Sequence, residues 1–133
     1  MIVDSSAIIA ILKKEPDWLS LSEALDRSAS NRMSAASYLE AAIVVDNRRN
    51  PVLSAGLDDL ILDAGISIEP LTAEQTRIAR QAYRDYGKGS GHPANLNFGD
   101  CFSYALAREK REPILCKGDH FLHTDLRPAI ALP

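Results

Sequence analysis

Cysteine and histidine are scarce in this sequence, and long apolar runs are missing. The 133 residues include 2 cysteines and 3 histidines, whose spacing matches no zinc-binding motif. We therefore expect Cys101 and Cys116 to be buried, reduced thiols. No stretch approaches the roughly 20 apolar residues of a membrane span, and the first residues lack the basic segment that opens a signal peptide. We expect a cytoplasmic protein that is not inserted in a membrane.

The charge balance also lacks the basic excess that is typical of nucleic-acid-binding proteins. The 15 lysines and arginines are outnumbered by 18 aspartates and glutamates, so the formal net charge is −3. Phosphate-binding surfaces are usually basic, and composition alone therefore neither supports nor excludes a nucleic-acid partner. A length of 133 residues and a hydrophobic fraction of 46% are typical of one globular domain, which we expect to span residues 1–133.

Short apolar segments alternate with helical patterns along the chain. Strands are expected at residues 1–3, 32–34, 66–71 and 113–116, with a weak last strand at 129–132. Helices are expected at residues 7–12, 18–29, 38–48, 52–63, 73–86 and 98–108, with a glycine-rich loop at 87–93. Strands that alternate with helices form parallel sheets. The sequence therefore predicts an α/β fold with a short, mainly parallel central sheet flanked by helices on both faces.

Polar residues mark several of the expected helix starts. Ser5 or Ser6 can cap the first helix, and Asn97 can cap the last one. Ser37-x-x-Glu40 and Thr72-x-x-Gln75 have the spacing of a capping box, in which two side chains satisfy each other's backbone N–H groups.

Four acidic residues interrupt otherwise apolar sequence: Asp4, Glu40, Asp100 and Asp119. Acids are seldom buried unless they are paired or bound to metal. Asp4 and Asp119 each follow an expected strand, and ligands of open α/β sheets bind at the carboxyl ends of the strands. Glu40 and Asp100 fall in the first turns of two helices. If those turns open onto the same crevice, four carboxylates meet there.

Converging carboxylates repel one another, and a divalent cation relieves that repulsion. Oxygen ligands without histidine or cysteine favour Mg²⁺ or Mn²⁺. Such an ion can activate water and neutralise charge on a phosphodiester, which is the chemistry of a hydrolytic nuclease. Each acid also has a simpler explanation. Glu40 can close the capping box with Ser37, Asp100 can favour the helix dipole, and Asp119 can be a turn residue beside Gly118.

Four segments together resemble the PIN-domain family, and more narrowly the VapC toxins. They are Ile2-Val3-Asp4-Ser5-Ser6-Ala7, Ser37-Tyr38-Leu39-Glu40, Asn97-Phe98-Gly99-Asp100-Cys101, and Lys117-Gly118-Asp119-x-Phe121 with Thr124-Asp125 behind it. The resemblance spans nearly the whole chain. It implies a PIN fold, endoribonuclease activity that depends on Mg²⁺ or Mn²⁺, homodimerisation, and inhibition by a VapB-type antitoxin.

The resemblance also implies roles for individual residues. Asp4 and Asp100 become direct metal ligands, while Glu40 and Asp119 act through water or hold a second ion. Ser6 matches a small hydroxyl residue that supports the site by hydrogen bonding to a carboxylate or a metal-bound water. Two positions depart from the family pattern. Lys117 stands where many relatives have threonine or serine, and His120 stands where a further acid is common.

Contacts with an RNA substrate are expected from basic and aromatic residues near the acidic site. The candidates for gripping phosphate are Arg84, Lys88, His92 and His120. Tyr83 and Tyr86 can stack on bases. The alternative is a half-buried helix end whose basic residues favour the helix dipole.

Two other functions compete with the nuclease. In the first, a phosphatase or receiver-like protein would use Asp4 as a phosphoacceptor with Lys117 beside it, although Ser6 stands where such a site has a second aspartate. In the second, a catalytically inactive PIN-fold module would bind RNA or protein.

Overall fold

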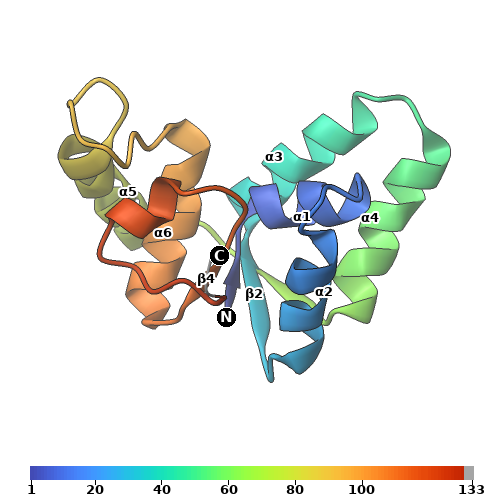
Figure 1. The fold of residues 1–133 in the computed structure, drawn as a ribbon. Coiled ribbons are helices and arrows are strands. Elements are labelled where there is room, and N and C mark those ends of the chain that lie inside the picture. The colour runs from blue at the N-terminus through green and yellow to red at the C-terminus, as the bar shows by residue number, and fades with distance from the viewer. Residues whose placement is uncertain (131–133) are drawn as a thin grey trace.

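A four-stranded parallel sheet with the strand order β3-β2-β1-β4 forms the centre of the computed structural model, which describes residues 1–130 (Figure 1). The strands are β1 (Ile2–Val3), β2 (Asn31–Ser34), β3 (Ile66–Glu69) and β4 (Ile114–Leu115). Ile2 of β1 pairs with Arg32 on one side and with Ile114 on the other, and every pairing is parallel. The expected α/β fold is confirmed, and the named strands are all parallel.

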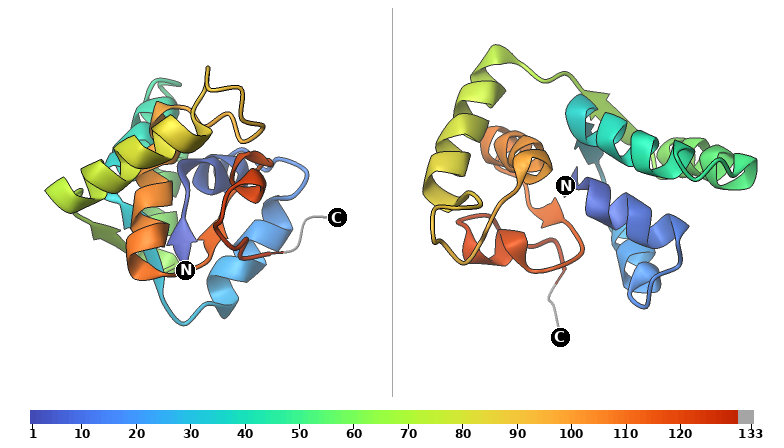
Figure 2. Two further views of the ribbon diagram at one scale, coloured as in Figure 1. Left: turned by 90° about the vertical axis from the view of Figure 1, so that its left-hand side faces the viewer. Right: turned by 90° about the horizontal axis from the view of Figure 1, so that it is seen from above.

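The helices form two groups on opposite faces of this sheet (Figures 1 and 2). One group contains α1 (Ser5–Leu12), α2 (Trp18–Arg27), α3 (Ala35–Asp46) and α4 (Pro51–Asp63). The other contains α5 (Ala73–Tyr86) and α6 (Phe98–Lys110), and a short 3₁₀ helix, η1 (His120–His123), follows β4. The carboxyl ends of β2 and β4 point toward the top of Figure 1, where α3 and η1 follow them.

Alternating strand residues divide the apolar core between the two faces. Ile2 and Ile114 pack with the helices α5 and α6, whereas Val3 and Leu115 pack with α1 to α4. This division follows from the strand itself, because successive side chains point to opposite faces of a sheet. All four side chains are almost fully buried, which explains why the strand segments read as continuous apolar runs.

Asp4 caps α1, and the prediction that Ser5 or Ser6 would do so is wrong. The Asp4 Oδ2 atom accepts a hydrogen bond from the Ser6 backbone N–H at 3.0 Å, and α1 begins at Ser5. An N-cap side chain satisfies one of the free N–H groups at the start of a helix. Asp4 therefore lies at the joint between β1 and α1, at the carboxyl end of a central strand.

The predicted capping box between Ser37 and Glu40 is also wrong. Helix α3 begins three residues earlier than expected, at Ala35, and Ser34 caps it by accepting a hydrogen bond from the Ala36 N–H at 3.3 Å. The strand β2 passes directly into this helix without a loop. Ser37 consequently faces the core, where it is fully buried, and the Glu40 carboxylate is free to contact another element.

Three further predictions were partly wrong. Thr72 accepts the Gln75 N–H, but the Gln75 amide donates to Glu109 instead of completing a capping box. Helix α2 ends at Arg27, two residues before its expected end. The weak last strand is reduced to an isolated bridge between Pro128 and Ile114, residues 129–130 form a bend, and residues 131–132 lie outside the described residues.

The structure also bears on the two cysteines and on the length and polarity of the helices. Cys101 and Cys116 are free and buried, as predicted. Among the helices that the structure describes, none combines the length and the apolar character needed to cross a membrane.

The burial of Leu106 on α6 predicts its effect on stability. Leu106 is 0% exposed in the core between α6 and the sheet, so we expect Leu106→Ala to lower the free energy of unfolding by about 2–5 kcal/mol. Leu62→Ala is the matched control, because Leu62 is 77% exposed on α4, and it should change stability by less than about 0.5 kcal/mol. Urea denaturation measures both, and equal losses would contradict this description of the core.

Candidate active site

A polar cavity of 240 Å³ lies at the carboxyl ends of β1 and β4, and all four predicted acids line it. Asp4 follows β1, Asp119 follows β4, and Glu40 and Asp100 come from the helices α3 and α6. The predicted convergence of the four carboxylates on one crevice is therefore what the fold produces. Ser6 and His120 line the same cavity.

Two serine residues fix the Asp4 carboxylate, which is only 3% exposed. Oδ1 accepts a hydrogen bond from the Ser103 hydroxyl at 2.5 Å, and Oδ2 accepts one from the Ser6 hydroxyl at 2.6 Å. The Ser6 backbone N–H adds the capping bond to Oδ2. The hydrogen bond from Ser6 to a carboxylate was predicted, whereas the role of Ser103 was not.

Burial raises the pKa of Asp4 above its usual value, because the charged form is shielded from water. The hydrogen bonds from Ser103 and Ser6 act in the opposite direction and lower it, while the negative charge of Asp100 raises it further. Three donors are therefore insufficient to compensate the buried charge. A positive charge in the cavity would stabilise the ionised form of Asp4.

A second buried hydroxyl supports the first. The Ser37 and Ser103 Oγ atoms lie 3.0 Å apart, and since Ser103 donates its proton to Asp4, Ser37 must donate to Ser103. This chain of hydroxyl groups links α3 and α6 to the end of β1. The sequence held one signal of it: Ser103 lies three residues after Asp100, a spacing that places two side chains on the same face of a helix.

Glu40 lies against the first turn of α6, where only a glycine leaves it room. Its Oε1 atom accepts a hydrogen bond from the Ser5 hydroxyl at 2.5 Å. A Cβ atom built on Gly99 would lie 2.0 Å from Glu40 Oε2, far inside van der Waals contact. Because Gly99 has no Cβ atom, the Glu40 carboxylate can lie directly against the backbone of α6.

Asp100 combines a helix cap with a contact in the cavity. Its Oδ2 atom accepts the Asn97 N–H at 3.0 Å while the Asn97 Oδ1 atom accepts the Asp100 N–H at 2.9 Å, which completes a capping box. His120 Nδ1 lies 2.9 Å from the same Oδ2 atom. The capping box was not predicted for Asp100, and this structural role does not exclude a role in the cavity.

Lys117 also lines the cavity, but its charge is paired with acids other than the four predicted ones. Its backbone N–H donates to the Ser6 Oγ atom at 3.0 Å, but its ammonium group forms ion pairs with Glu15 and Asp17 in the turn between α1 and α2. The hydrogen bond to Glu15 raises the pKa of Lys117, so the ammonium stays charged. This orientation argues against a phosphoacceptor site in which Lys117 assists Asp4.

Of the four candidate phosphate contacts, only His120 lines the cavity. Arg84 and Lys88 are exposed outside it, and the roles of all four residues stay predictions. The ring of His92 packs edge-on against Tyr86 at 4.9 Å between centroids, and Tyr86 also packs against Tyr104. These contacts favour the alternative of a half-buried helix end for Tyr86 and His92.

The chemistry of the cavity fits a hard divalent cation. Within residues 1–130, no lysine or arginine side chain forms a hydrogen bond or an ion pair with any of the four acids. In the same part of the chain, no three histidine, cysteine, aspartate or glutamate side chains are arranged to hold one metal ion together. Mg²⁺ usually keeps several water ligands and binds through one or two carboxylates, so the separated acids are compatible with it.

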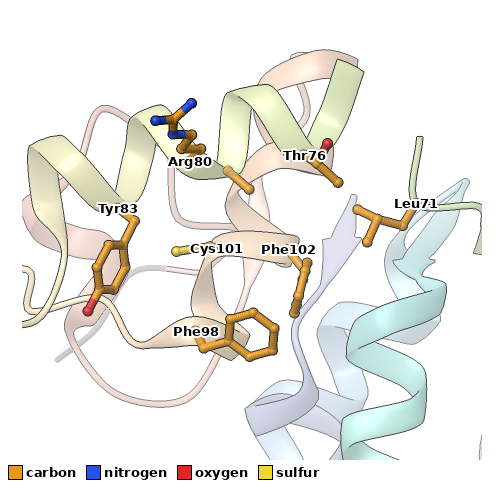
Figure 3. Close-up of a pocket in the computed structure, with 8 residues that line it drawn as sticks. Leu71, Thr76, Arg80, Tyr83, Phe98, Cys101 and Phe102 are labelled. Carbon is orange, nitrogen blue, oxygen red and sulfur yellow. The ribbon is translucent and has the colours of Figure 1, made fainter. Parts of the chain in front are cut away.

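A second cavity, of 510 Å³, lies between α5 and α6 and has a different character (Figure 3). Apolar and aromatic side chains dominate its wall, including those of Tyr83, Phe98, Cys101 and Phe102. No acid lines it. Of these two cavities, the one lined by Asp4, Glu40, Asp100 and Asp119 is the one that carries carboxylates.

The sheet order, the two helical layers and the carboxylates at the strand ends agree with a known protein family. A PIN-domain family model matches residues 1–126, and the chain belongs to the PIN-domain family. Its relatives include the VapC ribonuclease Mb0625 of Mycobacterium bovis and ribonuclease VapC28 of Mycobacterium tuberculosis. Each is 56% identical over 130 residues, which cover 98% of both chains. Ribonuclease VapC30 of Mycobacterium tuberculosis is 43% identical over the full length of both chains.

A solved structure shares the fold. The crystal structure of Mycobacterium tuberculosis VapC20, described as a toxin that cleaves the sarcin-ricin loop, superposes with a TM-score of 0.72. The match covers 94% of this chain and 95% of the other, with 15% sequence identity. At this level of identity the likeness shows the fold alone.

The raised pKa of Asp4 predicts a pH-dependent stability in the metal-free protein. The aspartate of an unfolded chain titrates near 3.8, whereas folded Asp4 holds its proton to higher pH. Between these two pKa values the folded state binds more protons, so its stability falls as the pH rises through this window. Asp4→Asn removes this loss, and the amide can still accept from Ser6.

Thermal unfolding in EDTA from pH 4 to pH 8 should therefore show Asp4→Asn gaining stability over the wild type as the pH rises. Asp119→Asn changes an exposed acid of the same cavity and should follow the wild-type profile. A constant difference between Asp4→Asn and wild type across this range would refute the prediction.

Proposed function

We propose that this chain is a VapC-type endoribonuclease, the toxin of a toxin–antitoxin pair, and that it hydrolyses RNA with a divalent metal ion at the acidic cavity. The single observation that carries the proposal is the convergence of Asp4, Glu40, Asp100 and Asp119 on one cavity in a chain whose relatives over nearly its full length are named VapC ribonucleases. Mg²⁺ and Mn²⁺ are the ions that an all-oxygen ligand set favours.

The four acids would hold the ion in two ways. Asp4 and Asp100 are the direct ligands, while Glu40 and Asp119 act through water from the same cavity. When bound, the ion lowers the pKa of water and neutralises the charge of a phosphodiester. Ser103 and Ser6 keep the Asp4 oxygens in fixed directions, and Ser5 does the same for Glu40. Such supporting hydrogen bonds orient metal ligands and tune their basicity.

His120 has a separate role in this proposal. Its Nδ1 atom faces Asp100, and its side chain remains 44% exposed at the cavity, where it can contact the phosphate of a bound RNA. Arg84, Lys88 and His92 are proposed to contact RNA farther from the acids. A cytoplasmic location, a homodimeric state and inhibition by a VapB-type antitoxin complete the proposal, and they rest on the resemblance to VapC relatives.

The second candidate function is an inactive PIN-fold module that binds RNA or protein. The presence of all four acids and of their hydroxyl supports favours the nuclease. The two functions differ in one observable, because the module would bind RNA without cutting it.

The decisive test is cleavage of bacterial RNA by antitoxin-free protein in Mg²⁺, in Mn²⁺ and in EDTA. We expect discrete fragments with either metal and none in EDTA. Asp4→Asn and Asp100→Asn should each reduce cleavage by at least about 100-fold, the upper end of what losing support around a metal costs.

Asp58→Asn is the matched control, since Asp58 is an exposed acid on α4 away from the cavity, and it should cleave like the wild type. RNA binding without cleavage by folded, metal-supplemented wild-type protein would establish the inactive module instead.

Gly99 provides a test that separates the site from the fold. An alanine Cβ there would displace the Glu40 carboxylate, so we expect Gly99→Ala to reduce cleavage by about 10–100-fold. The same change favours the helix by up to about 1 kcal/mol, and urea denaturation should show no loss of stability.

Gly56→Ala on α4 is the matched control for this helix effect, because its Cβ would meet Leu12 at an ordinary contact distance of 3.5 Å. It should leave cleavage unchanged. Full activity in Gly99→Ala would show that the position of Glu40 does not matter for the reaction.

A further inference from the structure

An ion-pair cluster connects the loop after β4 to the turn between α1 and α2. The Lys117 ammonium contacts the Glu15 carboxylate and lies 3.3 Å from Asp17 Oδ1. The three side chains are only partly exposed, at 35%, 31% and 42%. Asp17 Oδ1 itself is shut off from solvent, so the ammonium is the charge that compensates it. This cluster joins two segments about 100 residues apart in the sequence, residues 15–17 and residue 117.

The backbone of Lys117 reaches the acidic cavity at the same time. Its N–H donates to the Ser6 hydroxyl oxygen at 3.0 Å, and that hydroxyl donates to Asp4 Oδ2 at 2.6 Å. Gly118 follows with a φ of +91°, a conformation that other residues rarely adopt. The chain then places Asp119 and His120 at the cavity wall.

Asp119 depends on this backbone for its position. It precedes η1, but its side chain makes no capping hydrogen bond to that helix. The Asp119 backbone carbonyl accepts the Leu122 N–H at 3.0 Å, which fixes the start of η1 and leaves the carboxylate to follow the loop. Two attachments therefore hold the approach to Asp119: the Ser6 hydrogen bond and the ion pairs of Lys117.

We propose that Lys117 is a positioning residue whose ion pairs with Glu15 and Asp17 set the place of Asp119 in the metal site. The turn between α1 and α2 is thereby part of the support of that site. The inference rests on the proposed metal-dependent function, since Asp119 acts there on a bound ion. A direct contact between the Lys117 ammonium and RNA phosphate is the competing role.

The expected effects on folding stability and on metal affinity separate a positioning role of Lys117 from a general stabilising one. Partly exposed ion pairs contribute little to folding stability, with a median of about 0–1 kcal/mol. Residues that support a metal ligand have a much larger local effect, commonly about 10–100-fold in metal affinity or activity. Loss of the cluster should therefore change the loop and the site while the fold persists.

The test compares four variants of the whole chain: Lys117→Met, Lys117→Arg, the double variant Glu15→Gln/Asp17→Asn, and Lys13→Met. The last is a matched control, because Lys13 is an exposed lysine beside the same turn. The first readout is amide hydrogen exchange of the metal-free protein at Lys117 and Leu122, whose N–H groups donate to Ser6 Oγ and to the Asp119 carbonyl, and RNA binding is measured beside it. The second is the affinity of the folded protein for Mn²⁺, measured by calorimetry.

We expect Lys117→Met and the double variant each to accelerate exchange and to weaken Mn²⁺ binding by about tenfold. Lys117→Arg should restore most of the wild-type exchange rate and Mn²⁺ affinity, because arginine keeps the charge. Lys13→Met should match the wild type in both. Thermal midpoints should stay within about 4 °C of the wild type, the shift that about 1 kcal/mol produces in a chain of this size.

Two results would overturn the inference. Exchange at the amides of residues 117 and 122 that is unchanged in both Lys117→Met and the double variant would show that the cluster does not position the loop. RNA binding that is weakened by Lys117→Met but unaffected or strengthened by the double variant would assign Lys117 to the substrate. Absence of Mn²⁺ binding by the wild type would instead contradict the proposed metal-dependent function, and the exchange data would still decide the positioning role.

Discussion

The buried carboxylate of Asp4 is the constraint on which the rest of the site depends. It caps α1, accepts a hydrogen bond from the Ser103 hydroxyl of α6, and is linked through Ser6 to the loop that follows β4. A charge placed in this position is unfavourable in the absence of a cation, and the raised pKa of Asp4 expresses that cost. One side chain thus couples the start of α1, the buried helix α6 and the loop that follows β4, so their relative positions are set by the need to satisfy its two oxygens.

The order of acids along the chain predicted that Asp4 and Asp119 share a crevice, because the carboxyl ends of parallel strands lie at one edge of a sheet. Whether Glu40 and Asp100 join them depended on where the first turns of α3 and α6 lie, which only the fold shows. The local chemistry of the helix starts was less predictable. Ser37 and Glu40 have the spacing of a capping box, yet β2 runs directly into α3 and Ser34 takes the cap. Local patterns cannot reveal this shift, since it follows from the position of the strand in the sheet. The role of Ser103 depends on tertiary contact, and only its spacing from Asp100 hinted at it.

Side-chain direction was the other property that the sequence left open. Lys117 lies two residues before Asp119, and the phosphoacceptor interpretation of the sequence placed its ammonium group beside Asp4. In the structure it points to Glu15 and Asp17 instead. The acidic cavity consequently keeps its negative character, with His120 as the basic group that contacts one of its acids. In the proposed function a bound metal ion, and not the surface of a protein whose net charge is itself negative, would supply the positive charge that RNA phosphate requires.

Two strands of this fold pass into helices with at most one residue between them: β1 into α1 through Asp4, and β2 directly into α3. Loops ordinarily absorb insertions and deletions because their length is loosely constrained. A connection of one residue or none cannot absorb a change of length. Each added residue would rotate the following helix by about 100° relative to the sheet. Such a rotation would carry Ser6 or Glu40 out of the cavity in a single step. Changes of length at these joints are therefore incompatible with the site, and variation in chain length among proteins built this way must fall elsewhere.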